Sequence, residues 1–331
     1  MFYCVVITVF ISCLCIGPVS AQSQLHQVAE VRTFDLVYDA EVHSLPSERK
    51  DVAIWIPLPQ SDDHQDILDL RIDAQYEWTV ETESEYGNTM LHLALNDTDV
   101  ETISVTLYIR ARRHEYQRQL TTVAHPEPFD GRWLMPDRLV PLDAFVTDLA
   151  MKVTEEAGTE AAKARAIYDY VVDTMTYDKS GTGWGNGDIY WACDAKTGNC
   201  TDFHALFIGL NRAVGIPATF EIGFPLPSNR TSGQIEGYHC WAQFYLKDVG
   251  WIPVDTSEAN KNENQRDYFF GAHDQNRVLF SKGRDVNLQP PQQGAALNYF
   301  IYPYVEVNGE SFDNVSLRFT FSDVLSADLD K

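Results

Sequence analysis

The sequence predicts an α+β protein in which a β-sandwich precedes a domain of helices packed on an antiparallel sheet. Three observations predict it. Apolar and polar residues alternate from about residue 25 to 120, two amphipathic helical segments follow, and alternation then returns toward the C-terminus. The 331 residues, 44% of them hydrophobic, are enough for two domains with substantial cores.

The N-terminus has the pattern of a secretory signal peptide. No charged side chain occurs among the first 29 residues, and Phe2 to Ile16 form an apolar run shorter than a bilayer span. We expect residues 1–21 to be removed and the mature protein, which has no membrane span, to be secreted or periplasmic. Because no Lys or Arg precedes the run, a retained anchor is the alternative. Cleavage leaves an odd number of cysteines: Cys193, Cys200 and Cys240.

Residues 22–124 are expected to form the N-terminal β-sandwich domain, because two segments place apolar side chains on one face of a pleated strand. Residues 125–142 hold four prolines without periodicity and are predicted to be an extended linker. The alternating residues of the two strand segments are Val52, Ile54, Ile56 and Leu58, and Ile103, Val105, Leu107 and Ile109.

Residues 143–290 are expected to form the second domain. Apolar residues recur at helical intervals between Glu160 and Tyr177, and a second helix is expected from Thr201 to Val214, before the stop signal Gly215-Ile216-Pro217. Residues 291–331 are predicted to be a C-terminal β extension. Further strands of the second domain are expected over residues 218–224, 238–246 and 251–254.

Cys200 opens the second helix, directly after Gly198-Asn199. A thiol at a helix N-terminus meets unpaired backbone N–H groups and the positive end of the helix dipole, which favour the thiolate and raise its reactivity. The ordinary alternative is a buried structural cysteine. The position therefore predicts a nucleophile.

Two later strands carry a candidate base and a candidate acid. The strand period of two puts His239 and Trp241 on one face and Cys240 on the opposite, apolar face, so Cys240 is interpreted as a core residue. The next strand delivers Asp255. With the turn that we expect, Asp255 falls opposite Ala242, on the wrong face for His239, so a bulge or register slip must intervene. Nucleophile, base and orienting acid follow in order, as acyl-transfer chemistry requires.

This arrangement resembles the transglutaminase-like superfamily over about residues 140 to 290. The resemblance implies a papain-like transglutaminase core in which Cys200 is the nucleophile, His239 its general base and Asp255 the residue that orients the imidazole. Members include cross-linking enzymes, cysteine peptidases, amidases and domains that have lost activity. The blocks that carry the resemblance are Gly198-Asn199-Cys200, Tyr238-His239-Cys240-Trp241 and Trp251-Ile252-Pro253-Val254-Asp255.

We therefore expect an exported thiol acyl-transfer enzyme that forms a Cys200 thioester from a peptide, protein or glycopeptide substrate and needs no cofactor. Hydrolysis by a cysteine peptidase or amidase is favoured, because secreted bacterial members of the family look more often like hydrolases. A protein-glutamine transglutaminase is the alternative. A non-catalytic transglutaminase-like binding module is the alternative of another class, and the intact Cys, His and Asp set disfavours it.

A glycine-rich loop, residues 181–187, lies between the two helices and is followed by aromatic residues. Such a loop could form an aromatic rim for a peptide or glycan chain, whereas the ordinary interpretation is a turn with tryptophans in the core. The candidate substrate-binding residues are Trp184, Tyr190, Trp191 and, on the His239 face, Trp241.

Metal binding is a rival interpretation, since Cys200 and His204 lie one helical turn apart, and His239 and Cys240 could complete four ligands. Strand alternation turns Cys240 away from His239, so no metal site is predicted. The formal net charge of −23, from 48 acidic and 25 basic side chains, excludes nucleic acid as an expected partner.

Overall fold

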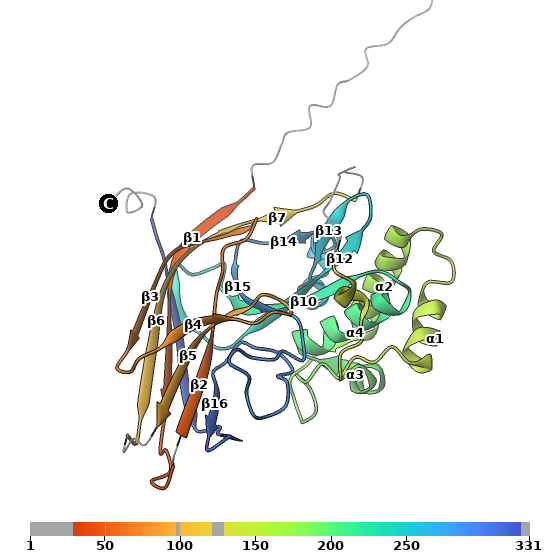
Figure 1. Cartoon of the computed structure of the whole chain (residues 1–331). Coiled ribbons are helices and arrows are strands. Elements are labelled where there is room, and N and C mark those ends of the chain that lie inside the picture. Colours follow the sequence, from red (N-terminus) through yellow and green to blue (C-terminus); the bar gives the residue numbers. More distant parts are fainter. Residues whose placement is uncertain (1–28, 50, 97–99, 121–128, 326–331) are drawn as a thin grey trace, which may run out of the picture.

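The computed structural model describes residues 29–49, 51–96, 100–120 and 129–325. They form an α+β fold in which two five-stranded sheets lie on one side, a third sheet lies in the middle and the helices lie against it on the other side (Figure 1). The predicted signal peptide lies outside the described residues, as does part of the predicted linker. In the part of the chain that is described, no helix is long and apolar enough to cross a membrane.

Two five-stranded sheets bury alternate side chains in one shared hydrophobic core, as the alternating segments of the sequence predict. The first sheet has the order β11-β18-β1-β6-β3, with bounds Ser232–Ile235, Val315–Asp323, Val31–Val42, Ile103–His114 and Gln65–Ala74. The second has the order β17-β16-β2-β5-β4, with bounds Glu310–Ser311, Tyr304–Val307, Asp51–Leu58, Thr89–Asn96 and Thr79–Thr82.

The C-terminal strands are members of these two sheets. β18 pairs antiparallel with β1, from Phe34 opposite Asp323 to Val42 opposite Val315, and β16 pairs with β2. The segment 291–331, expected to be an extension, therefore completes sheets that the N-terminal region begins. The alternation of apolar and polar residues predicts that a segment is a strand. It does not predict which distant strand will pair with it, because that depends on the tertiary fold.

The third sheet has the order β13-β12-β10-β15, with bounds Gly250–Val254, His239–Leu246, Ala218–Pro225 and Arg277–Lys282. Two short pairs complete the strands: β7 with β14, and β8 with β9, with bounds Tyr116–Gln117, Ala272–His273, Thr176–Tyr177 and Thr197–Gly198. The helices α1 to α5 span Ala144–Val153, Glu160–Thr174, Ile189–Ala195, Cys200–Ala213 and Thr256–Lys261.

Helix α4 lies at the centre of the helical half and contacts the four other α-helices as well as β10 and β12. Side chains on every face of α4 are buried from residue 200 to 212, as is typical of a helix enclosed on all sides. The predicted helix 201–214 is thus found one residue earlier. It ends before Gly215, which adopts the positive φ of +81° that a helix-terminating glycine supplies.

The hairpin of β12 and β13 corrects one expectation. Ala242 pairs with Val254, so the expected pairing of Ala242 with Asp255 is wrong by one residue. The turn is longer than expected and ends at Gly250, whose φ of +97° suits a three-residue loop. The offset places Asp255 beyond the paired residues, where it becomes the N-cap of α5.

Candidate active site

Two side chains fix the first turn of α4. The Asn199 side chain accepts the backbone N–H of Thr201 at 2.8 Å, and Asp202 Oδ2 accepts the N–H of Asn199 at 3.0 Å, which together form a capping box. Cys200 is therefore the first residue of α4, at the positive end of the helix dipole. Cys200 is 1% exposed, so its thiol lies beneath the surface.

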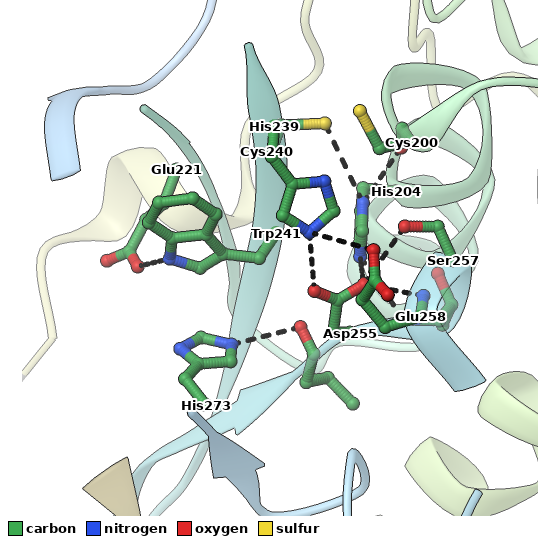
Figure 2. A network of polar contacts seen from close by, with 12 residues as sticks. Cys200, His204, Glu221, His239, Cys240, Trp241, Asp255, Ser257, Glu258 and His273 are labelled. Atoms are coloured by element: carbon green, nitrogen blue, oxygen red, sulfur yellow. Dashed lines mark hydrogen bonds and ion pairs between the residues drawn. The ribbon is translucent and has the colours of Figure 1, made fainter. Parts of the chain in front are cut away.

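The end of β12 and the start of α5 bring His239 and Asp255 together. His239 Nε2 lies 2.7 Å from Asp255 Oδ2, and Figure 2 shows the other ring nitrogen on the side of Cys200. Asp255 Oδ1 accepts the N–H of Glu258 and the hydroxyl of Ser257, both at 3.0 Å. The carboxylate is fully buried, and the N-cap geometry holds it in one orientation toward the imidazole.

The electrostatics of the three groups favour a thiolate and an imidazolium. Burial alone would raise the pKa of the Cys200 thiol, but hydrogen bonds from Cys240 and His239 lower that pKa well below its usual value. Burial would lower the pKa of His239, yet the charge and hydrogen bond of Asp255 raise it to about 10. Burial opposes ionisation of Asp255 as well, but His239 and Arg277 hold the pKa of its carboxyl well below the ordinary range.

Arg277 is part of this network, although nothing in its sequence context predicts a role. It lies on β15, its guanidinium Nη1 is 3.0 Å from Asp255 Oδ2, and the residue is only 2% exposed. The same oxygen of Asp255 therefore contacts both a buried guanidinium and the imidazole of His239. This geometry keeps Asp255 ionised inside the protein.

His204 is a second buried histidine, one turn along α4 from Cys200. Its Nδ1–H donates to the Cys200 carbonyl at 2.8 Å, and its Nε2 accepts the N–H of Thr256 at 3.2 Å. These partners define a neutral imidazole, and burial lowers the pKa of His204 in agreement with that state. His204 thereby ties the first turn of α4 to the start of α5.

The glycine-rich loop is fastened to α4 by Asp202, whose carboxylate accepts the N–H of Gly185 at 2.7 Å and of Gly187 at 2.9 Å. Gly183 packs directly against the Trp191 ring, where a Cβ would lie 2.5 Å from Nε1. The loop is thus an ordered structure next to the N-terminus of the helix that begins with Cys200.

The four aromatic residues proposed to bind substrate lie in different surroundings. Trp184 and Trp191 are half-buried in or against the loop, and Tyr190 is 45% exposed, with its hydroxyl donating to Asp143 at 2.5 Å. Trp241 is fully buried, and its indole N–H donates to Glu221 at 2.6 Å. A buried, hydrogen-bonded indole offers no surface to a substrate, so Trp241 fits a structural role.

Two clefts meet at His239. One has a volume of about 420 Å³ and the other about 510 Å³, and His239, Glu258 and Leu226 line both. Basic side chains of the first cleft are Lys179, Arg230 and Lys261. Acidic side chains found in the second cleft alone are Glu30, Glu115 and Asp274. The four aromatic candidates line neither cleft.

The arrangement can activate the Cys200 thiol next to an imidazole that lines two clefts. Among the described residues, no group of three or more His, Cys, Asp or Glu side chains is arranged so that it could hold a metal ion. Of the three residues His239, Cys200 and Asp255, only His239 lines the clefts, and Cys200 lies beneath the surface next to it.

Comparisons with known proteins match the central part of the chain to one family. Residues 147–256 match the family model described as the transglutaminase-like superfamily. A protein of Haemophilus influenzae, described as uncharacterized, is 27% identical over 312 residues, covering 81% of this chain and 85% of its own.

Solved structures extend the likeness to most of the chain. A candidate cysteine protease from Cytophaga hutchinsonii matches with a TM-score of 0.60 at 17% identity, covering 90% of this chain and 92% of its own. The periplasmic domain of TgpA from Pseudomonas aeruginosa covers 72% of this chain and 91% of its own at 14% identity, with a TM-score of only 0.36. The α+β fold with a papain-like transglutaminase core after a strand-rich N-terminal region is thereby confirmed.

Proposed function

We propose that this chain, which carries a transglutaminase-like core at residues 147–256, is a thiol acyl-transfer enzyme that hydrolyses amide bonds in peptides or proteins. One observation carries the proposal. The side chains of Cys200, His239 and Asp255 form a continuous polar chain in which the thiol pKa is lowered and the imidazole pKa is raised to about 10. We assign the catalytic domain to residues 143–290.

The first half of the reaction forms a thioester. The Cys200 thiolate attacks the carbonyl carbon, and the developing oxyanion accepts the backbone N–H of Cys200 at the start of α4, where such groups lack helical partners. His239 then gives its Nδ1 proton to the departing amine, and the acyl group remains on sulfur. Asp255 keeps Nε2 of His239 protonated and the ring oriented throughout.

The second half returns the enzyme to its starting state. Water enters, His239 takes one of its protons, and the hydroxyl oxygen attacks the thioester to release a carboxylic acid and the Cys200 thiolate. A primary amine in place of water would give transamidation, the transglutaminase alternative. The description of the Cytophaga protein as a candidate cysteine protease agrees with hydrolysis.

The substrate that suits the site is an extended chain. Because the two clefts approach His239 from either side, a peptide can occupy both and present an internal carbonyl between them. The aromatic residues Trp184, Tyr190 and Trp191 stay as candidates for contacts farther along the substrate. Because these aromatic residues do not line the clefts, whereas Lys261, Arg230 and Glu30 do, the latter three are the better first targets for changing substrate specificity.

The proposal is tested with purified protein, a mixture of denatured protein substrates and a dansylated primary amine in heavy-oxygen water. Hydrolysis incorporates heavy oxygen into new carboxyl groups, whereas transamidation incorporates the dansyl group. Cys200→Ala should abolish both signals while keeping the fold. Retained turnover in Cys200→Ala would refute the mechanism, and no turnover in the intact protein, despite a reactive thiol, would favour the non-catalytic module.

We further propose that residues 1–21 direct export and are removed. Expression of the full chain in a bacterial host, followed by fractionation and N-terminal sequencing, should find a mature protein that begins at Gln22 outside the cytoplasm. An intact Met1 in the membrane fraction would support the retained anchor, and an intact Met1 in the cytoplasm would refute export.

A further inference from the structure

Cys240 is a second thiol that the proposed reaction does not use. The sequence assigns it to the core side of β12, away from His239, and in the structure that side faces the first turn of α4. The Cys240 sulfur lies 3.7 Å from the Thr201 hydroxyl and 3.7 Å from His204 Nδ1. Figure 2 shows the sulfur atoms of Cys200 and Cys240 next to each other in front of this turn.

The two thiols are unequal partners. The Cys240 thiol lies within hydrogen-bonding reach of the Cys200 sulfur, and this contact lowers the pKa of Cys200. Burial and the adjacent Cys200 thiolate raise the pKa of Cys240 well above its usual value. The Cys200 sulfur is thus prepared to react with electrophiles, whereas Cys240 keeps its proton as long as Cys200 is a thiolate. Cys193, by contrast, is half-buried on α3, and burial raises its pKa to about 11.

We propose that Cys240 is the resolving thiol of a reversible oxidative modification at Cys200, with hydrogen peroxide or an organic hydroperoxide as the oxidant. Formation of the disulfide does not depend on the proposed function. Its effect on activity rests on the proposed function, because a Cys200 locked in a disulfide cannot attack a carbonyl.

The chemistry balances in two steps. The Cys200 thiolate attacks one peroxide oxygen, the O–O bond breaks, and Cys200 sulfenic acid forms while hydroxide or alkoxide leaves. The Cys240 sulfur then attacks the Cys200 sulfur, the S–O bond breaks, and the disulfide forms while the Cys240 proton departs with the hydroxyl as water. Two equivalents of a thiol reductant restore both thiols and become a disulfide themselves.

The alternative fate of the sulfenic acid makes the proposal testable. Without a resolving thiol, a second peroxide oxidises it to the sulfinic acid, which thiol reductants cannot reverse. Cys240→Ser keeps a hydroxyl donor beside Cys200 but cannot form the bridge, and Cys240→Ala removes both. These two variants therefore separate the hydrogen bond from the disulfide.

The experiment treats the full mature protein and both variants with a small excess of hydrogen peroxide, then blocks free thiols, digests with trypsin and maps the cysteines by mass spectrometry. Trypsin places the three cysteines in separate peptides, residues 180–196, 197–212 and 231–247. In the wild type we expect a cross-linked product of 197–212 and 231–247 that has lost two hydrogens and disappears with dithiothreitol.

Both variants should instead accumulate peptide 197–212 with two added oxygens, and dithiothreitol should not restore labelling of Cys200. Peptide 180–196 should change little in any of the three proteins and serves as the internal control. Two results with the wild type would refute the proposal. One is sulfinic acid at Cys200 without the cross-linked product, and the other is a disulfide that includes Cys193. Neither result depends on whether a variant folds. Loss of activity without the cross-link also refutes it, whereas a reversible cross-link in a protein that hydrolyses nothing refutes the proposed function alone.

Discussion

Asp255 binds four kinds of partner at once, an imidazole, a guanidinium, a hydroxyl and a backbone N–H, and this makes it the residue on which the polar network depends. One oxygen contacts His239 and Arg277, and the other caps α5 through the N–H of Glu258. Burying a carboxylate costs desolvation free energy. Hydrogen bonds from a cation, an imidazole and a backbone N–H offset that cost.

The reactivity of Cys200 should be almost independent of pH where that of an ordinary thiol rises steeply. Since its pKa is lowered and that of His239 is raised to about 10, the thiolate and imidazolium coexist across the neutral range. A free thiol with a pKa of about 8.5 gains roughly a hundredfold in iodoacetamide reactivity between pH 6 and 8. We expect the iodoacetamide reactivity of Cys200 to rise less than about tenfold over the same pH range.

Cys193 provides the control in the same molecule, because burial raises its pKa to about 11 and its labelling should stay slow below pH 8. Mass spectrometry of the separate tryptic peptides measures both rates in one sample. Hydrolysis should decline as pH rises through about 10, because His239 loses the proton that the leaving amine needs. Cys200 labelling that follows the curve of a free thiol would contradict the ion pair.

Arg277→Gln should destabilise the protein strongly. The substitution removes the buried cation from Asp255, and breaking a buried ion pair costs about 3–5 kcal/mol of the free energy of unfolding. The pKa of Asp255 is lowered in the folded state, so its contribution to stability is fully present above the unfolded value of 3.8 and is lost progressively as pH falls from there through the lower, folded-state pKa. The difference in free energy of unfolding between the wild type and Arg277→Gln should therefore become smaller in acid.

Urea denaturation at pH 7 and pH 3.5 measures this difference. The matched control is Arg266→Gln, because Arg266 pairs with Asp169 and Asp173 near the surface, where ion pairs contribute at most about 1 kcal/mol. Equal effects of the two substitutions would mean that Arg277 does not hold Asp255 as the geometry indicates.

At the scale of elements, the start of α4 joins three separate segments. Asp202 accepts N–H groups from Asn199, Gly185 and Gly187, so one carboxylate closes the helix and fastens the glycine-rich loop. At Gly198, whose φ is +154°, a Cβ would lie 2.4 Å from Asp202 Oδ2, so the side chain also needs a glycine beside it. The loop and the helix are therefore one structural unit.

Asp202→Ala should release this loop and lower the free energy of unfolding by at least about 1–3 kcal/mol, since buried N–H donors lose their acceptor. Chymotryptic cleavage after Trp184 and the rate of Cys200 alkylation report on the loop and the helix start. Thr159→Ala is the control, because it removes the N-cap of α2 at a cost of about 1 kcal/mol but lies outside this unit. Unchanged cleavage in Asp202→Ala would show that other contacts hold the loop.

The elements themselves were largely predictable from the sequence, because each has a local cause. Helical periodicity and Gly215 located α4 to within one residue, and alternation located β2 and β6. The register of β12 and β13 was not predictable, because it depends on a three-residue turn whose length the sequence does not fix. A shift of one residue decided on which side of the hairpin Asp255 lies.

At the scale of the whole molecule, the strand-rich half and the helical half share one core. Phe224 of β10 packs against Phe319 of β18 with ring centroids 4.3 Å apart, and against Tyr38 of β1 at 5.9 Å. The strand-rich half also supplies Glu30 and Glu115 to one of the clefts at His239. The N-terminal region thus helps to build one of the two clefts at His239.

Phe319→Ala should therefore weaken both halves together. Truncating a buried phenylalanine costs about 3–5 kcal/mol, and the shared core predicts a single unfolding transition at a lower temperature. Thermal scans followed by far-ultraviolet circular dichroism and by tryptophan fluorescence test this. Arg318→Ala, at a neighbouring exposed position, should change stability by no more than about 0.5–1 kcal/mol. Two separate transitions would show independent domains.

The fold class, the helix that begins with Cys200 and the candidates His239 and Asp255 could be predicted from the amino-acid sequence, because periodicity, glycine stops and helix-start chemistry act over a few residues. The pairing of β18 with β1 and the burial of Trp241 become visible only in the folded chain. The same holds for the contact of Arg277 with Asp255 and for that of Cys240 with Cys200. Those contacts join residues that are distant in the chain or on opposite faces of a strand, and their positions depend on packing that no local pattern encodes.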